Sequence, residues 1–241
     1  MMTSTWQRLT TLVRELGAKT ASLYLLDRAL RRVNHRCGFF FYQFWAQPVH
    51  DRPRLPLARG RAYSFRLIQA MDPALSDLGR PSAVISQRFS QGAQCLMTTK
   101  GDALVGCIWF VHHTYIEDEV RVDYVLPKDG ACVWDFDVFV APPERLGFLF
   151  AKQWDAFDAL LKPQGVCYTI SRINAFNQRS IASHRSLGAG KCGWALFLCL
   201  GSFQWMMSNQ HPFVAFGGRP RLCIGPLMPS KSRVFSGLDP N

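Results

Sequence analysis

The sequence lacks several features that would place it in a broad class of proteins at once. No run among its 241 residues reaches the roughly 20 apolar positions that a membrane-spanning helix needs. Residues 1–20 are amphipathic and have no uninterrupted apolar core, so no secretory signal is expected. We find no internal repeat, no low-complexity segment and no recognised nucleic-acid motif. A cytoplasmic protein that does not bind nucleic acid is therefore expected.

Paired cysteines are also missing. The eight cysteines stand singly, without a CxxC pair, and several lie inside apolar runs such as residues 106–110. This pattern favours buried free thiols in a reducing compartment over disulfides or zinc. Metal-ligand spacing to carboxylates or thiols is absent around five histidines: His35, His50, His112, His113 and His211. We therefore expect no metal site.

Acidic residues are scarce at both ends of the chain. Residues 1–61 carry 11 Lys/Arg against 3 Asp/Glu and residues 190–241 carry 5 against 1, whereas residues 62–189 carry 12 against 13. This distribution of a net charge of +11 suggests an acidic partner, of which anionic lipid, an acidic carrier protein, a phosphorylated cofactor and nucleic acid are the options. A soluble protein with a basic surface is the alternative.

Apolar residues are plentiful, and they predict three parts of one large domain. Hydrophobic residues make up 48% of the chain, enough for a full core. Residues 1–61 are expected to form a basic extension that contains an aromatic strand at 38–49 and ends in a proline-rich loop at 50–61. Residues 62–200 form the main domain, and residues 201–241 complete it with an aromatic, Met-rich strand and tail.

The extension begins with two helical segments within residues 4–33, each with apolar residues spaced for one face. Arg28, Arg31 and Arg32 populate the far side of the second segment. Such a basic amphipathic helix either packs on its own domain or lies against an anionic membrane surface. The sequence leaves both alternatives open.

The main domain is predicted to be α+β, with a mixed, mostly antiparallel sheet of about six or seven strands flanked by helices. Residues 131–189 read as a strand at 132–140, a turn, a helix from Arg145 to about Leu161, a parallel strand at 166–173 and a short helix that ends near Ala189. Helical turns are expected within 72–91, with an interruption at residues 79–81. Further strands are expected at 62–69, 93–99, 103–115, 119–126 and 193–200.

Two motifs within this unit carry a resemblance to a known family. The first is a V-x-P-x-x-R pattern at the strand-to-helix turn, filled by Val140, Pro142 and Arg145. The second is an N-x-x-[AS]-x-x-x-Y-x-x-x-G-F pattern, matched at three positions by Asn177, Ser180 and Gly188. Together with the order of elements over residues 62–200, they make the chain similar to the GNAT acyltransferase superfamily.

The resemblance implies an acyl-CoA co-substrate, acetyl-CoA first, with its thioester and phosphates near the turn. Donor-binding residues are expected at the backbone of 138–140 and at four side-chain or turn positions. These residues are Val138, Phe139, Val140, Arg145, Gly147, Asn177 and Ser180. Asn177 is a good helix N-cap in any case. Helix-start N–H groups and the helix dipole supply the attraction for phosphate.

The turn departs from the family pattern. Phe148 and Phe150 stand where glycines usually let the backbone approach the phosphates, and Gly147 sits one residue early. Two explanations remain open: a shifted loop that still binds coenzyme A through Gly147, or an acyl chain delivered on an acidic acyl-carrier protein.

Carboxylates on the strand before the turn are the candidates for a general base. By period-2 alternation Asp135 and Asp137 share one face, where repulsion would raise one pKa toward the value that a base for an ammonium nucleophile needs. A structural role, binding backbone or arginine groups, is the alternative. His184 stands where the family usually has Tyr, so the resemblance makes it the acid for the departing thiolate; a structural contact is its alternative.

Two further segments are candidates for lining the acceptor site. Residues 117–119 with Asp123 form an acidic cluster that is either a solvated strand edge or a binding site for a cationic amine. Residues 203–225 are either core strand and cover or a lining for an acyl chain.

The resulting expectation is an N-acyltransferase of the EC 2.3.1 type, with acetyl transfer first, that acts on a small-molecule or peptide amine. Its base is Asp137 or Asp135 and its acid is His184. The alternative is a catalytically degenerate GNAT fold that serves as a ligand-binding or membrane-peripheral regulatory module.

Overall fold

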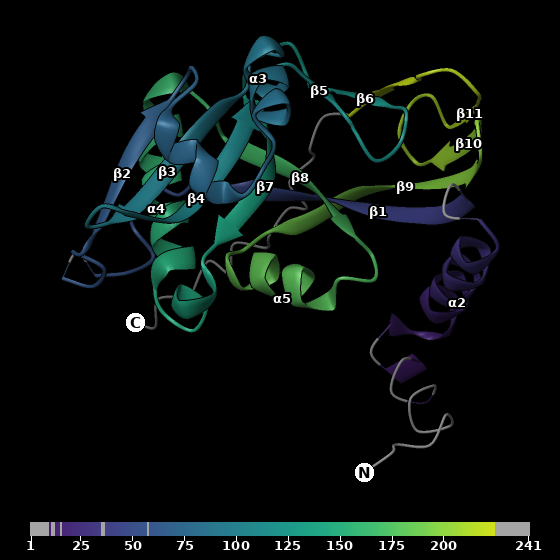
Figure 1. Ribbon diagram of the computed structural model, residues 1–241, viewed down its shortest axis with the longest axis horizontal. Coiled ribbons are helices and arrows are strands. Elements are labelled where there is room, and N and C mark those ends of the chain that lie inside the picture. The colour runs from purple at the N-terminus through teal and green to yellow at the C-terminus, as the bar shows by residue number, and fades with distance from the viewer. Residues whose placement is uncertain (1–9, 11–12, 15, 35–36, 57, 225–241) are drawn as a thin grey trace, which may run out of the picture.

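The computed structural model describes residues 10, 13–14, 16–34, 37–56 and 58–224 (Figure 1). Its centre is a nine-stranded sheet in the order β11-β10-β9-β1-β8-β7-β4-β3-β2. The strands of this sheet are β1 (Cys37–Pro48), β2 (Tyr63–Ile68), β3 (Gln94–Lys100), β4 (Ala103–Val111), β7 (Cys132–Val140), β8 (Tyr168–Asn174), β9 (Gly190–Leu200), β10 (Phe203–Ser208) and β11 (Val214–Phe216). The helices are α2 (Ala18–Val33), α3 (Ser82–Ser90), α4 (Leu149–Leu161) and α5 (Gln178–Ser186), with 3-10 turns η1 (Pro73–Leu78), η2 (Pro142–Glu144) and η3 (Lys162–Gln164).

The expected α+β class is confirmed. Among the described strands of the sheet, β7 and β8 are the parallel pair, and the other neighbours run antiparallel. The sheet has nine strands rather than six or seven because β1, β10 and β11 extend it.

The strand β1 lies inside the sheet, although its residues were expected within an amino-terminal extension. It pairs with β8 on one side and with β9 on the other, and Tyr42 and Phe44 are fully buried. An aromatic strand that packs on both faces needs such a central position. The sheet therefore draws on all three parts into which the sequence was divided.

The strand expected at 119–126 does not join this sheet. A separate three-stranded sheet contains β5 (Thr114–Ile116), β6 (Asp123–Val125) and β12 (Arg221–Cys223), and β4 pairs directly with β7. Glu117 explains the break, because its buried carboxylate accepts hydrogen bonds from the backbone N–H groups of Asp118 and Glu119. This local hydrogen bonding turns the chain away from the strand path.

The helix α4 begins four residues later than the sequence predicted. Pro142 and Pro143 form the tight turn η2, and the N–H of Gly147 then closes a second turn onto the carbonyl of Glu144 at 3.1 Å. The prolines lack N–H groups and suit such a turn. The chain therefore makes two turns before regular helix starts at Leu149.

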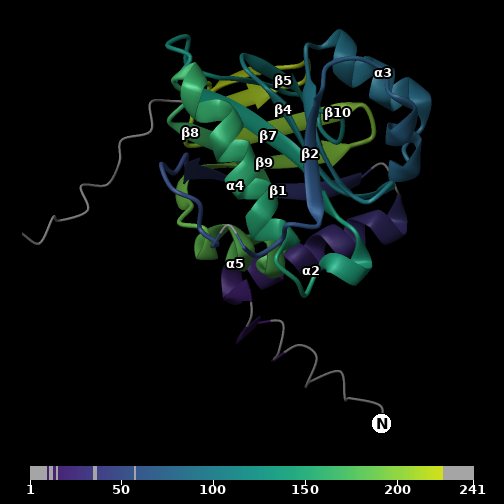
Figure 2. The same ribbon diagram turned by 90° about the vertical axis from the view of Figure 1, so that its left-hand side faces the viewer.

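Two apolar layers cover the two faces of the sheet. On one face α4 packs Trp154, Phe157 and Leu161 against β4 and β7. On the opposite face η1, α3 and the small sheet pack around Trp109 and Trp134. Figure 2 shows α4 and α3 on opposite sides of the sheet. All eight cysteines are free thiols, and none of the described helices is long and apolar enough to cross a membrane.

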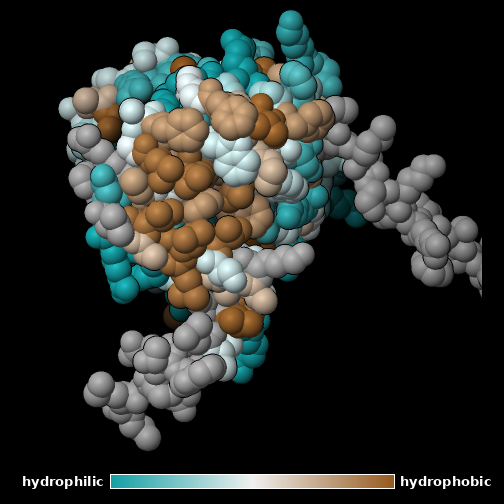
Figure 3. All heavy atoms as spheres, turned by 90° about the vertical axis from the view of Figure 1, so that its right-hand side faces the viewer, coloured by the Kyte–Doolittle hydropathy of each residue, from teal (hydrophilic) through white to brown (hydrophobic). Residues whose placement is uncertain are grey.

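One side of the molecule keeps a large apolar surface (Figure 3). It is the side on which α2 and β9 to β11 lie in Figure 1. The exposed apolar residues of these strands and their connections are Leu200, Phe203, Phe213, Val214 and Phe216. Residues 203–216 thus form strands at the far edge of the sheet, while β12 lies in the three-stranded sheet.

Candidate active site

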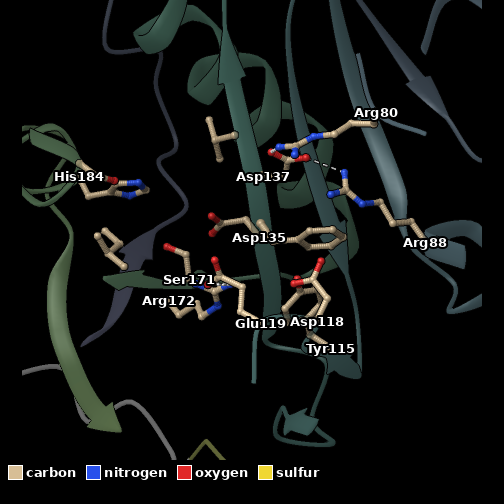
Figure 4. Close-up of a pocket in the computed structure, with 14 residues that line it drawn as sticks. Arg80, Arg88, Tyr115, Asp118, Glu119, Asp135, Asp137, Ser171, Arg172 and His184 are labelled. Atoms are coloured by element: carbon tan, nitrogen blue, oxygen red, sulfur yellow. Dashed lines mark hydrogen bonds and ion pairs between the residues drawn. The ribbon is translucent and has the colours of Figure 1, made fainter. Parts of the chain in front are cut away.

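The parallel strands β7 and β8 separate along their length. They pair only from Cys132–Trp134 to Tyr168–Ile170; beyond this point β8 continues with β1, and β7 continues with β4. Residues 135–140 of β7 therefore have no strand partner on the β8 side among the described strands. A cavity of about 370 Å³ opens at this split, between β7, β8, α5, α3 with the turn before it, and the β5–β6 loop (Figure 4).

Asp135 is the first residue of β7 beyond the paired region, and it lines the cavity. Its residue surface is 1% exposed, and neither carboxylate oxygen has a hydrogen-bond donor among the described residues. Burial raises the pKa of Asp135 to about 7, while the nearby hydroxyls of Thr169 and Ser171 lower that pKa in part without standing at hydrogen-bonding geometry. A buried carboxyl that titrates near neutrality and faces a cavity is suited to proton transfer.

Asp137 does not share the face of Asp135, contrary to the alternation that the sequence predicted. Its φ is 46°, and β7 holds one extra residue opposite Cys107–Trp109 of β4, which marks a β-bulge. The bulge turns Asp137 toward Arg80 and Arg88, each 2.7 Å from one of its oxygens. Both acceptor oxygens of Asp137 are therefore engaged, as in the structural role that the sequence also allowed.

His184 of α5 lies across the cavity from β7 (Figure 4). It is 6% exposed, with its ring edge-on to Trp154 and Phe150 of α4 at 5.6 and 6.2 Å between centroids. Burial among these rings lowers the pKa of His184 to about 4. The imidazole is therefore neutral at pH 7. It has one N–H that can donate a hydrogen bond, but it lacks the second proton that an imidazolium could transfer.

The acidic β5–β6 loop forms the opposite wall of the cavity. Asp118 and Glu119 line it, whereas Asp123 lies outside it and pairs with Arg219. Arg172 of β8 binds the buried Glu117 through two nitrogens and Glu119 at 2.9 Å. Asp118 has no cationic partner among the described residues, so this wall keeps a negative charge.

Aromatic side chains form part of the same wall. Tyr115 is buried, lines the cavity and packs against Phe136 with 4.5 Å between ring centroids. Its ring also stacks on Trp134 at 5.8 Å. The apolar surface behind the carboxylates gives the alkyl part of a cationic ligand a place to pack.

The second motif places Asn177 and Ser180 at the start of α5. Asn177 is the N-cap, with its side-chain oxygen accepting a hydrogen bond from the N–H of Ser180 at 3.1 Å. Ser180 lines the cavity. The cap thus uses the oxygen of Asn177 and positions Ser180 next to His184.

The first motif lies beside the cavity, and Val138, two residues before the motif, lines the cavity. The carbonyl of Phe139 accepts a hydrogen bond from Gln153, and that of Val140 accepts one from Nε of Arg145 at 3.1 Å. The side chain of Arg145 thus folds back on the turn and keeps its outer nitrogens exposed. Gly147 packs closely, since a Cβ there would lie 3.3 Å from the carbonyl oxygen of Glu144.

The two phenylalanines of the turn have different surroundings. Phe150 lies in the first turn of α4 and packs toward His184 and Trp154, away from the turn surface. Phe148 is exposed, with the guanidinium of Arg59 stacked over its ring at 4.7 Å. The start of α4 has no side-chain cap and no acidic residue in its first turn.

Sequence reasoning did not name three charged residues of the cavity: Arg80, Arg88 and Arg172. Ser171 also lines the cavity, and the sequence had suggested that the thioester binds between the strands near Val140 and Ser171. The arginines carried no signal, because their contacts join segments about 50 residues apart in the chain.

No protein-family model and no curated protein sequence matches the chain. Among solved structures, a functionally unknown conserved protein from Staphylococcus epidermidis ATCC 12228 matches with a TM-score of 0.50 and 8% identity, over 83% of this chain and 82% of that chain. A tandem GNAT protein from the clavulanic acid biosynthesis pathway matches at 0.42 with 14% identity, over 68% of this chain and 55% of that one, so the chain spans about half of its length. A GCN5-related N-acetyltransferase from Anabaena variabilis ATCC 29413 matches at 0.38 with 11% identity, over 86% and 66%. At these identities the likeness concerns the fold.

Proposed function

We propose that this chain, which has a GNAT-like fold, is an N-acyltransferase that moves an acyl group from a pantetheine thioester to an amine. The observation that carries the proposal is Asp135. It is a buried carboxylate without a hydrogen-bond partner among the described residues, and it sits at the split between two parallel strands. Leaving such a group unpaired is costly unless a ligand or solvent in the cavity satisfies it.

Asp135 acts as the general base. Its carboxylate takes a proton from the ammonium of the acceptor, and the free amine attacks the thioester carbonyl. The C–N bond forms, the C–S bond breaks, and the second proton released from nitrogen goes to the departing sulfur. A base that titrates near pH 7 is matched to this task.

His184 donates a hydrogen bond to the departing sulfur. Its pKa of about 4 means that it holds no extra proton at pH 7, so it stabilises the thiolate through its neutral N–H rather than by protonating it. Ser171 and Ser180 supply further hydroxyl groups in the same cavity.

The donor arm adds to the free edge of β7. Residues 135–140 offer backbone groups without a strand partner on that side, which an extended pantetheine arm can pair with. At the end of this edge lie the uncapped start of α4 and the exposed guanidinium groups of Arg145 and Arg59. Helix N–H groups and arginines there suit phosphate oxygens, of coenzyme A or of a carrier protein's prosthetic group.

The test is an acyl-transfer assay that detects the acylated amine by mass spectrometry, with acetyl-CoA, a long-chain acyl-CoA and acyl-carrier protein compared as donors. Asp135→Asn keeps the shape of the side chain, and we expect its turnover to fall about 100- to 10,000-fold. The matched control is Asp102→Asn in the exposed β3–β4 turn, which should keep full activity. No turnover with any donor would refute the transferase.

A binding module without catalysis is the second candidate. The exposed Leu146 and Phe148 in the donor turn favour it, because apolar side chains replace the small residues that let phosphates approach. Thermal-shift measurements separate the candidates: a module that does not use the donor shows no shift with acetyl-CoA, long-chain acyl-CoA or free coenzyme A.

A further inference from the structure

The cavity has two ends of opposite charge, with Asp135 between them (Figure 4). Arg80, Arg88 and Asp137 form one end, and Asp118 and Glu119 form the other. Asp135 indicates a bound ligand independently of these charged ends. It is 1% exposed, has no hydrogen-bond partner among the described residues and lines the same cavity. The charges at each end decide what that ligand is.

The arginine end keeps a surplus of positive charge. Arg80 and Arg88 share the single carboxylate of Asp137, and each makes one hydrogen bond to it. No other hydrogen-bond acceptor for either guanidinium is found among the described residues. The side chain of Arg88 is 12% exposed and its guanidinium stacks over Trp109 and Phe136, so Arg80 offers the more accessible N–H groups. The side chain of Arg80 is 49% exposed, which lets a carboxylate approach from the cavity.

The loop end keeps a surplus of negative charge. Glu117 and Arg172 neutralise each other as a buried pair. Glu119 gives one oxygen to Arg172 and to the hydroxyl of Tyr42, and Asp118 is exposed without a cationic partner in the described part of the chain. Two carboxylates therefore face a ligand over the aromatic wall of Tyr115.

We infer that the acceptor is a basic α-amino acid. Its carboxylate binds Arg80 and Arg88, its side-chain cation binds Asp118 and Glu119, and its α-amine lies at Asp135. The position of Asp135 supports an α-amine, because Asp135 lies in the same cavity between the two charged ends, as the α-amine lies between the carboxylate and the side-chain cation of a basic amino acid. This inference rests on the proposed transferase function for the chemistry, but the binding it describes does not require a donor.

The test measures binding without any donor, by calorimetry, for L-lysine, cadaverine and L-norleucine. Cadaverine lacks the carboxylate, and norleucine lacks the side-chain cation. We expect each to bind at least tenfold more weakly than lysine. Arg80→Gln should weaken lysine and norleucine but leave cadaverine unchanged, and Asp118→Asn should weaken lysine and cadaverine but leave norleucine unchanged.

The matched controls are Arg52→Gln and Asp102→Asn, which change the same charges at exposed positions outside the cavity. This crossed pattern separates ligand contacts from a loss of structure, which would weaken all three compounds together. Lysine that binds no better than cadaverine or norleucine, or variants that match their controls, would overturn the inference. If lysine binds as expected and no donor acylates it, the amino-acid site stands and the transferase proposal falls.

Discussion

Replacing Asp135 with Asn should make the protein more resistant to alkaline pH while it strongly lowers turnover. Folding raises the pKa of this carboxyl from the ordinary 3.8 to about 7. Because the folded state keeps the proton over a range where the unfolded chain has lost it, stability falls as the pH rises from about 4 to about 7. The full shift corresponds to about 4 kcal/mol, at about 1.4 kcal/mol for each pKa unit.

The comparison between two pH values isolates this effect. Between pH 5 and pH 8 the wild-type protein should lose about 3 kcal/mol of stability relative to Asp135→Asn. Any constant cost of the buried amide cancels in this difference, as do the titrations of other groups. At roughly 2–4 °C per kcal/mol for a domain of this size, the difference between the melting temperatures should change by roughly 6–12 °C.

Urea unfolding followed by the fluorescence of the seven tryptophans measures these free energies. Asp102→Asn serves again as the control and should follow the wild type at both pH values. If the difference in the free energy of unfolding between wild type and Asp135→Asn is the same at pH 5 and pH 8, the carboxyl has an ordinary pKa in the folded protein. The assignment of Asp135 as the base is then unsupported.

Three further predictions test other parts of the account. His184→Phe keeps the ring contacts with Phe150 and Trp154, so we expect lower turnover with unchanged donor affinity. The wild type should lose about 3 kcal/mol of stability between pH 6.5 and pH 4 that the variant keeps. The reason is that His184 takes up a proton at a higher pH in the unfolded chain than in the folded one. An equal acid sensitivity in both proteins would contradict the buried neutral imidazole. Deleting residues 1–61 removes β1 from the centre of the sheet, and we expect an insoluble or unfolded product; a folded product by circular dichroism would contradict the role of β1. The exposed Leu25 and Leu26 and the arginines of α2 predict co-sedimentation with anionic vesicles that high salt reduces, and protein that stays in the supernatant rejects this contact.

The strands could largely be predicted from the sequence because their apolar residues alternate or run continuously. The bounds of β7 agree with the expectation at both ends, and the interruption of residues 72–91 near Gly79 falls between η1 and α3. The position of β1 could not be predicted, since pairing with β8 and β9 joins residues more than 120 positions apart. Local pattern carries no information on such a partner.

The candidate site was predicted in its parts but not in its geometry. Asp135 and Asp137 were named as candidates for the base, yet alternation placed them on one face. The bulge at Asp137 reverses this, and a bulge leaves no mark in a sequence without glycine at that position. The arginines that form ion pairs with Asp137 come from a different segment of the chain. The different roles of the two carboxylates could therefore not be predicted from the sequence.

The central claim is that Asp135 takes the proton from the acceptor, and the pH dependence of kcat/KM tests it most directly. In the wild type kcat/KM should rise with pH to about 7 and then level off, because the base is ionised above its pKa. In Asp135→Asn the residual kcat/KM should keep rising above pH 7, up to the pKa of the acceptor amine, since only amine that is already neutral can react. Identical profiles for the two proteins would contradict the account.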